Sequence, residues 1–84
     1  MIWEIELTAA ARRDLRGLPA NVSRRIGEAL ERLAETGRGD VVKMRGHDLE
    51  WRLRVGDYRV RLSFEFPSQT IRVLRVRHRR EAYR

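Results

Sequence analysis

The chain lacks cysteine altogether and contains only two histidines, His47 and His78, which lie far apart in the sequence. Without cysteine there can be no disulfide framework, no thiolate nucleophile and no cysteine-ligated zinc. Two separated histidines do not form the ligand pattern of a metal site either. The sequence therefore predicts a protein that works with no metal and no other cofactor.

Long apolar runs are also missing, because no segment approaches the roughly 18 apolar residues that a membrane-spanning helix needs. The first residues alternate and carry Glu4 and Glu6 where a signal peptide would carry cations. A chain of 84 residues has room for one domain with a thin core and no buried cofactor cavity. We therefore expect a single domain over residues 1–84 and a cytoplasmic location.

Lysine is nearly absent, yet the chain is strongly basic. Lys43 is the only lysine among 19 basic residues, and 12 acidic residues leave a net charge of 19 − 12 = +7. Residues 1–44 carry eight bases and seven acids, net +1, whereas residues 45–84 carry eleven bases and five acids, net +6. A GC-rich genome would explain arginine in place of lysine, but it would not explain this asymmetry. Arginine binds phosphate through a planar, two-pronged group, so the asymmetry indicates a polyanionic partner.

Hydrophobic periodicity predicts the order of the elements. An alternating strand precedes a helical hairpin whose first helix is capped by Thr8 and whose second ends near Thr36, followed by Gly37. The strand is expected at residues 3–7, the first helix at 9–17, and four further strands at 41–44, 51–55, 58–66 and 70–77. This order, β-α-α-β-β-β-β, predicts an α+β fold in which the helices cover one face of a four-stranded, mainly antiparallel sheet.

The last strand has apolar residues at both odd and even positions: Ile71, Val73, Leu74 and Val76. A strand with apolar side chains on both faces is typical of a central strand that is buried on two sides. We therefore expect this strand to lie inside the sheet.

A two-residue turn at Gly56 and Asp57 determines the register of the preceding and following strands. In that register Arg54 lies opposite Arg59, and Arg52 lies opposite Arg61. Because side chains alternate between the faces of a strand, all four arginines share one face, and the core face carries Trp51, Leu53, Val55, Tyr58, Val60 and Leu62. Like charges directly opposite each other destabilise a sheet by roughly 0.2–1 kcal/mol per pair. Either the guanidinium groups splay into solvent and pair with Glu50 and Glu65, or the face binds a phosphate backbone; we favour binding.

The C-terminal residues extend this basic surface. Arg77, His78, Arg79 and Arg80 are followed by Tyr83. A tyrosine near the end of a chain often serves only for packing. Beside clustered arginines, Tyr83 is instead a candidate for proton transfer or for stacking on a base.

Two segments, residues 51–60 (WRLRVGDYRV) and 76–83 (VRHRREAY), resemble the RelE/ParE superfamily of toxins from type II toxin–antitoxin modules. The alternating first strand, the helical hairpin and the segment from Val42 to Gly46 agree with the same pattern, so the resemblance covers essentially the whole chain. It implies a RelE-like fold. It also implies an endoribonuclease that cleaves mRNA in the ribosomal A site, by metal-free attack of the 2′-hydroxyl on the adjacent phosphate. The partners implied are the ribosome, mRNA and a cognate acidic antitoxin in a hetero-oligomer.

The resemblance also assigns roles to residues of this chain. The catalytic positions of the family match Arg52, Arg54, Arg59, Arg79 and Tyr83. RelE itself has lysines where this chain has Arg52 and Arg54, and arginine keeps its proton, so these two would act only electrostatically. The base would then be Tyr83 or, as a second candidate, His78. The RNA-binding positions that we expect around these residues are Arg45, Arg61, Arg77 and Arg80.

Two other functions stay open at this point. A ParE-type toxin poisons DNA gyrase by protein contact, and a third possibility is a non-catalytic nucleic-acid-binding module. All three require a basic surface, but only the ribonuclease requires Tyr83 and Arg79 for RNA cleavage, which makes it the favoured interpretation.

Overall fold

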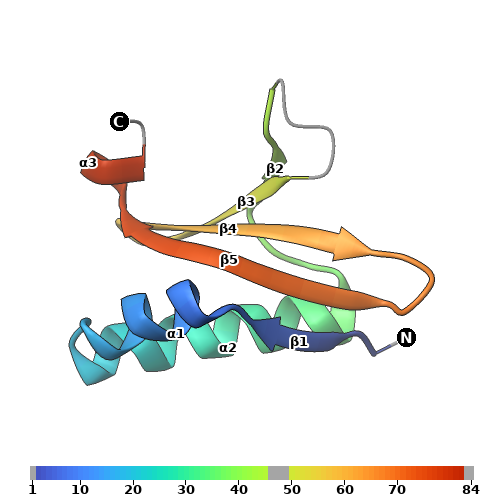
Figure 1. Ribbon diagram of the computed structural model, residues 1–84, viewed down its shortest axis with the longest axis horizontal. Helices are drawn as coiled ribbons and strands as arrows, with labels where there is room; N and C mark the ends of the chain where they lie inside the picture. Colours follow the sequence, from blue (N-terminus) through green and yellow to red (C-terminus); the bar gives the residue numbers. More distant parts are fainter. Residues whose placement is uncertain (1, 46–49, 83–84) are drawn as a thin grey trace.

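The computed structural model describes residues 2–45 and 50–82 (Figure 1). Its elements follow the expected order: β1 (Glu4–Leu7), α1 (Ala9–Arg16), α2 (Ala20–Thr36), β2 (Val41–Lys43), β3 (Trp51–Val55), β4 (Tyr58–Glu65) and β5 (Thr70–His78). A short helix that the sequence pattern did not predict, α3 (Arg79–Ala82), ends the described part of the chain. Within these residues, no helix is both long and apolar enough to cross a membrane.

The helix ends form where local chemistry places them. The hydroxyl of Thr8, the N-cap of α1, accepts a hydrogen bond from the Ala11 N–H at 3.1 Å. At the end of α2, Gly37 has φ 72°, the left-handed conformation that glycine adopts without a Cβ clash. Its N–H donates to Leu33 O at 2.9 Å. The predicted caps are both confirmed.

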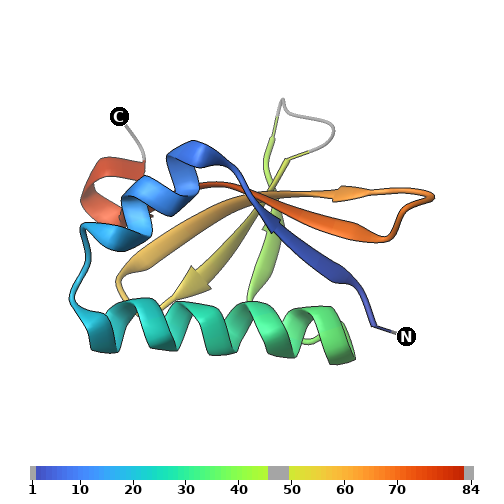
Figure 2. The ribbon, with the colours of Figure 1, turned by 60° about the horizontal axis from the view of Figure 1, so that its bottom comes forward.

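One sheet of five strands forms the body of the protein, in the order β1-β5-β4-β3-β2. β1 lies parallel to β5, and the other neighbours are antiparallel. The α+β class is therefore confirmed, but the sheet has five strands rather than four, because β1 joins the edge beside β5. Figures 1 and 2 show α1 and α2 together on one face of this sheet.

The core lies between α2 and the covered face of the sheet. Ile26, Leu30 and Leu33 of α2 are at most 4% exposed, and Leu53, Val60 and Leu62 of the hairpin are at most 1% exposed. The predicted register is confirmed for the whole β3–β4 hairpin, from Val55 opposite Tyr58 to Trp51 opposite Leu62. Gly56, the first residue of the turn, has φ 57°.

A β-bulge in β5 corrects the interpretation of its apolar pattern. Arg61 of β4 pairs with Arg75, but the next residue, Leu62, pairs with Val73, so Leu74 is an extra residue in β5. The bulge lets both Val73 and Val76 face the core, where each is at most 4% exposed. β5 does lie inside the sheet, between β1 and β4. The prediction that it is buried on two sides is wrong, since half-buried Leu74 reflects the bulge and not a second covered face.

Candidate nucleic-acid interface

Three strands place arginines side by side on the uncovered face of the sheet. Arg54 of β3 pairs with Arg59 of β4, which pairs in turn with Arg77 of β5. The next row on the same face contains Arg52 and Arg61. We call these five residues the arginine face. Because like charges on neighbouring strands repel each other, rows of this kind are unfavourable unless the charges meet acids or a ligand.

Two members of the arginine face are neutralised within the protein. Arg54 donates two hydrogen bonds to the carboxylate of Asp40, at 2.8 and 2.9 Å. Arg61 likewise donates to both carboxylate oxygens of Glu50, at 2.9 and 2.7 Å. The pairing of Arg61 with Glu50 agrees with the alternative that the sequence analysis did not favour, whereas Glu65 pairs with Arg72 at 3.2 Å. Acids thus compensate the arginine face around Arg54 and Arg61.

Arg59 and Arg77 remain cationic at the hairpin-turn end of this face. Neither forms an ion pair with any residue in the ranges 2–45 and 50–82. Arg59 Nη1 donates to the carbonyls of Gly56 and Tyr58, each at 3.0 Å. These two bonds hold its guanidinium group over the turn, and a group held in this way loses less conformational entropy when it binds a phosphate.

Arg75 belongs to the second row by register, opposite Arg61, but its side chain contacts α1 instead. Its Nε and Nη2 donate to the Asp14 carboxylate at 2.9 and 3.2 Å. Asp14 also accepts the backbone N–H of Val76 at 2.9 Å. Burial raises the pKa of Asp14, but the hydrogen bonds from Arg75 and Val76 and the charges of Arg75 and Arg77 outweigh it, so the pKa is lowered overall.

The Asp14–Arg75 contact was not predicted, although the sequence contains a signal for it. Asp14 is the only acid between Thr8 and Gly17, and it follows buried Ala11 by three residues on the apolar side of α1. An acid on a buried stripe needs a cationic partner. Which of the many arginines supplies that partner depends on the packing of α1 against β5.

The C-terminal arginines lie beside the β3–β4 turn. The Arg79 N–H donates to Asp57 O at 2.7 Å, and the Arg79 Nε lies 3.8 Å from the Asp57 carboxylate. Both Arg79 and Arg80 are exposed. The turn therefore brings Arg79 to the same end of the sheet as Arg59 and Arg77.

His78 and Arg45, two further predicted site residues, do not lie beside Arg59 and Arg77 on the arginine face. His78 pairs with Tyr58 across β5 and β4, and the two rings meet edge to face with centroids 5.4 Å apart. In the alternation of β5, this puts His78 on the opposite face from Arg77. His78 Nδ1 accepts the N–H of Arg80 at 3.2 Å. Arg45 is exposed just after β2, away from the β3–β4 turn, and Tyr83 lies outside the described residues.

The arginine face is suited to binding a phosphate and stabilising its charge. No group of three or more histidine, aspartate or glutamate side chains within residues 2–45 and 50–82 is arranged to hold a metal ion. Guanidinium groups bind phosphate oxygens through parallel N–H bonds and stabilise added negative charge. They do not accept protons, so the arginine face by itself provides binding and charge stabilisation, but no general base.

Solved structures with this fold include toxins in complex with antitoxins. An archaeal RelE–RelB complex from Pyrococcus horikoshii matches with a TM-score of 0.80 and 27% identity, covering 98% of this chain and 100% of that one. The toxin–antitoxin complex RelBE2 from Mycobacterium tuberculosis matches with a TM-score of 0.82 and 26% identity, covering 93% and 99%. The isolated RelE toxin of Escherichia coli, with a TM-score of 0.76 and 17% identity over 90% of this chain and 83% of that one, shares the fold.

Sequence comparison identifies the family directly. No curated protein matches the chain. The family model described as the ParE toxin of the type II toxin–antitoxin system parDE matches residues 5–83, nearly the whole sequence. The chain therefore belongs to the ParE toxin family, and it is a toxin of a type II toxin–antitoxin system within the RelE/ParE group.

Proposed function

We propose that this toxin is a ribosome-dependent mRNA endoribonuclease that binds the RNA backbone with its arginine face. Residues 1–84 act as one toxin domain in this proposal, in the cytoplasm where ribosomes are found. The observation that carries it is the pair Arg59 and Arg77, which lie opposite each other on adjacent strands with no acidic partner among the described residues. A cationic pair whose members form no ion pair with the described residues suits a phosphodiester.

The proposed reaction is a transesterification. The 2′-oxygen of a ribose attacks the adjacent phosphorus, a 2′,3′-cyclic phosphate forms, and the bond to the 5′-oxygen of the next nucleotide breaks. Negative charge accumulates on the phosphoryl oxygens, where Arg59, Arg77 and Arg79 would stabilise it. Arg52 and Arg54 add electrostatic stabilisation, and Arg45, Arg61 and Arg80 add contacts to the RNA backbone.

Two proton transfers accompany this step, since the 2′-hydroxyl loses a proton and the departing 5′-oxygen gains one. The arginines do not perform the first transfer. We assign proton transfer to Tyr83, with His78 as the alternative. The contact of His78 with Tyr58 and its bond to the Arg80 N–H direct its ring away from the arginine face, which favours Tyr83.

A cognate antitoxin is the proposed partner. Similar chains are described as RelE toxins in complexes with RelB antitoxins. The net charge of +7 makes an acidic antitoxin the complementary partner for this toxin. We propose a toxin–antitoxin hetero-oligomer in which the antitoxin neutralises this charge.

Mapping of mRNA 5′ ends by primer extension in a translation extract tests the nuclease proposal. We expect new cleavage ends with the wild-type protein and about a 100-fold loss of cleavage in the double variant Arg59→Ala/Arg77→Ala. Arg12→Ala/Arg16→Ala removes two exposed arginines of α1 and should leave cleavage unchanged. Equal loss in both double variants, or no cleavage by the wild type, would contradict the proposal.

The ParE description of the matching family model supports a second candidate, inhibition of DNA gyrase. A supercoiling assay distinguishes the two functions. Inhibited supercoiling without mRNA cleavage would establish the second candidate in place of the first.

A further inference from the structure

The short helix α3 depends on contacts at its first residues. It is a single turn of four residues, Arg79–Ala82, and helices this short are not stable alone in water. Figure 1 shows it at the end of the sheet where the β3–β4 turn lies. Its first two N–H groups have acceptors outside the helix. Arg79 donates to Asp57 O at 2.7 Å, and Arg80 donates to His78 Nδ1 at 3.2 Å.

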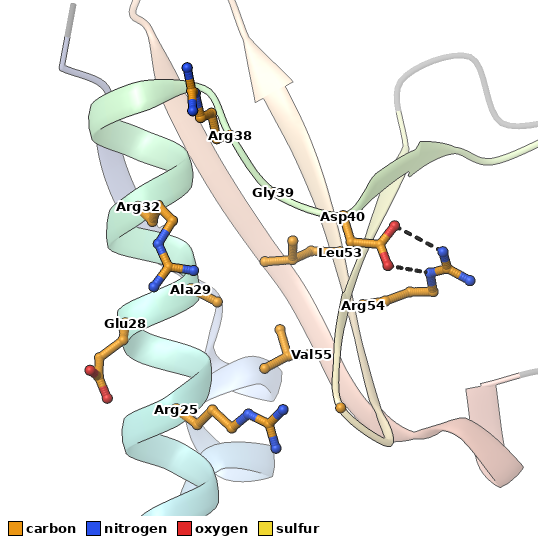
Figure 3. Close-up of a pocket in the computed structure, with 11 residues that line it drawn as sticks. Arg25, Glu28, Ala29, Arg32, Arg38, Gly39, Asp40, Leu53, Arg54 and Val55 are labelled. Carbon is orange, nitrogen blue, oxygen red and sulfur yellow. Dashed lines mark hydrogen bonds and ion pairs between the residues drawn. The ribbon is translucent and has the colours of Figure 1, made fainter.

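The Asp57 acceptor belongs to the β3–β4 turn, which contacts on two sides hold in place. Asp40 accepts two hydrogen bonds from Arg54 of β3. Figure 3 shows this pair, and it shows Arg25 extending from α2 toward β3 beside a groove of about 340 Å³ between these two elements. A Cβ atom on Gly56 would lie 2.9 Å from Arg25 Nη1, so Arg25 reaches the turn itself. The bond from α3 to this turn joins two backbone groups and does not depend on pH.

His78 lies at the N-cap position of α3, directly before its first residue. N-cap side chains accept a hydrogen bond from the N–H of the second or third helical residue, and Arg80 is the second. A ring nitrogen of histidine accepts a hydrogen bond only when it carries no proton. The bond from Arg80 therefore requires a neutral ring with its proton on Nε2, and a proton on Nδ1 would abolish the cap.

The ring of Tyr58 holds this imidazole in position. Tyr58 lies opposite His78 in the pairing of β4 with β5, and the rings meet at 81° with centroids 5.4 Å apart. Both residues are half-buried. A ring that is already fixed loses less conformational entropy when it accepts a hydrogen bond. The cap of α3 is thus built into the sheet rather than formed by a freely moving side chain.

Charged and titratable groups surround His78 from its own segment, from α1, from β4 and from the turn. They are Arg77, Arg79, Arg80, Glu81, Arg13, Asp14, Tyr58 and Asp57. Burial raises the pKa of Asp14, but its hydrogen bonds outweigh burial and the pKa lies below the ordinary value of 3.8, so Asp14 stays charged near neutral pH. Histidine is the side chain that ordinarily changes charge between about pH 5 and pH 8. Four arginines and three carboxylates give these neighbours a net charge of 4 − 3 = +1, so a proton on the ring enters a cationic region.

We propose that His78 is a positioning residue: its neutral ring caps α3 and keeps Arg79 at the turn end of the arginine face, and its protonation releases α3. The inference rests on the nuclease function proposed above, in which Arg79 stabilises charge on the phosphoryl group. Because only the neutral ring forms the cap, the cap is complete above the range in which histidine titrates and is lost as the pH falls through that range. Acidification below about pH 6.5 should therefore weaken RNA cleavage.

Amide signals of the ¹⁵N-labelled full chain test the cap itself, between about pH 8 and about pH 5.5. In the wild-type protein, the Arg80 signal should move toward its random-coil position as the pH falls. Asparagine caps helices with an oxygen that does not titrate in this range, so in His78→Asn the signal should stay constant. His47→Asn, which removes the other histidine, should behave like the wild type. A constant signal in the wild type, or a moving signal in His78→Asn, would overturn the proposal.

Cleavage rates on purified ribosomes programmed with mRNA test the consequence for function. The ratio of the wild-type rate to the His78→Asn rate should fall about threefold from about pH 8 to about pH 6, and this ratio cancels the pH response of the ribosomes. At pH 8, His78→Asn should cleave about fivefold faster than His78→Ala, because only asparagine can replace the cap. Equal rates of these two variants would show that His78 transfers protons and would overturn the positioning role. Far-ultraviolet circular dichroism verifies that both variants fold.

The two measurements separate this inference from the proposed function. If the wild-type protein cleaves no mRNA, but its Arg80 signal responds to pH only while His78 is present, the nuclease assignment fails and the cap stands. If the wild-type protein cleaves mRNA and the ratio of its rate to that of His78→Asn is constant with pH, the inference about His78 fails and the nuclease assignment stands.

Discussion

Asp14 of α1 binds Arg75 of β5 through two hydrogen bonds, at 2.9 and 3.2 Å, across 61 residues of sequence. The same carboxylate accepts the N–H of Val76 at 2.9 Å. β1 pairs with β5 only as far as Val73, so beyond the bulge the edge of β5 would be open to solvent. The Asp14 carboxylate accepts a backbone hydrogen bond that a neighbouring strand would otherwise accept at this edge. It also binds Arg75, whose side chain therefore does not join the arginine face.

Replacement of Asp14 by asparagine should destabilise the protein. The side chain of Asp14 is only 17% exposed, and hydrogen bonds to a charged group typically contribute about 1.5–3 kcal/mol. We expect Asp14→Asn to lower the free energy of unfolding at pH 7 by an amount in this range, measured by urea denaturation. The matched variant Asp40→Asn breaks an ion pair that is about half exposed on both sides, and it should cost less than about 1 kcal/mol.

The same carboxylate makes stability depend on pH. Because the folded-state pKa of Asp14 is lowered below its ordinary value of 3.8, its contribution is complete above that value and is lost as the pH falls through the folded-state pKa. Between pH 5 and pH 2, the wild-type protein should therefore lose more stability than Asp14→Asn. Equal acid sensitivity of the two proteins in urea titrations would show that other carboxylates cause the loss.

Gly27 inside α2 and Gly37 directly after it should respond to alanine in opposite directions. Gly27 lies inside the helix, where a Cβ atom would meet nothing within 4 Å, and Gly27→Ala should stabilise the protein by about 0.5–1 kcal/mol. Gly37 has φ 72°, so Gly37→Ala should destabilise it by about 1 kcal/mol. Thermal unfolding measures both effects. Stabilisation by Gly37→Ala would mean that α2 does not end in a left-handed residue.

Gly56→Ala should destabilise the β3–β4 turn for two separable reasons. Its φ of 57° disfavours alanine, and the new Cβ would lie 2.9 Å from Arg25 Nη1. We expect a loss of about 1–2 kcal/mol in the free energy of unfolding. In the background Arg25→Ala, the contact is absent and only the backbone cost should remain. A double-mutant cycle that shows no coupling between the two positions would contradict the close approach of Arg25 to the turn.

Removal of Arg59 and Arg77, which form no ion pair with the described residues, should change the salt dependence of RNA binding. For single-stranded RNA, each phosphate contact contributes about 0.7 to the slope of log K against log salt. Arg59→Ala/Arg77→Ala should therefore reduce this slope by about 1.4, measured by anisotropy with a labelled single-stranded RNA. Arg12→Ala/Arg16→Ala, which removes the same charge from α1, should leave the slope nearly unchanged.

Local features were predicted correctly wherever a few neighbouring residues decide them. Thr8 and Gly37 end their helices through contacts within one turn. The turn at Gly56 and Asp57 determines that Arg54 faces Arg59 and that Arg52 faces Arg61, because a two-residue hairpin allows only one register. The arginines of β3 and β4 on the arginine face therefore follow from the sequence alone.

Other features depend on segments that meet only when the chain folds. The bulge at Leu74 is invisible in the apolar pattern of β5, and it reverses which of its residues face the core. Likewise, no local rule pairs Asp40 with Arg54 and Glu50 with Arg61 while Arg59 and Arg77 form no ion pair with the described residues.

The sequence by itself thus determined the helices, the hairpin, its register and the excess of positive charge, because each depends on local backbone geometry or on composition. Tertiary structure alone decided which charges are neutralised and where a groove remains between α2 and β3. These outcomes depend on distances between residues that are remote in sequence, and only the packing of α1 and α2 against the sheet determines those distances.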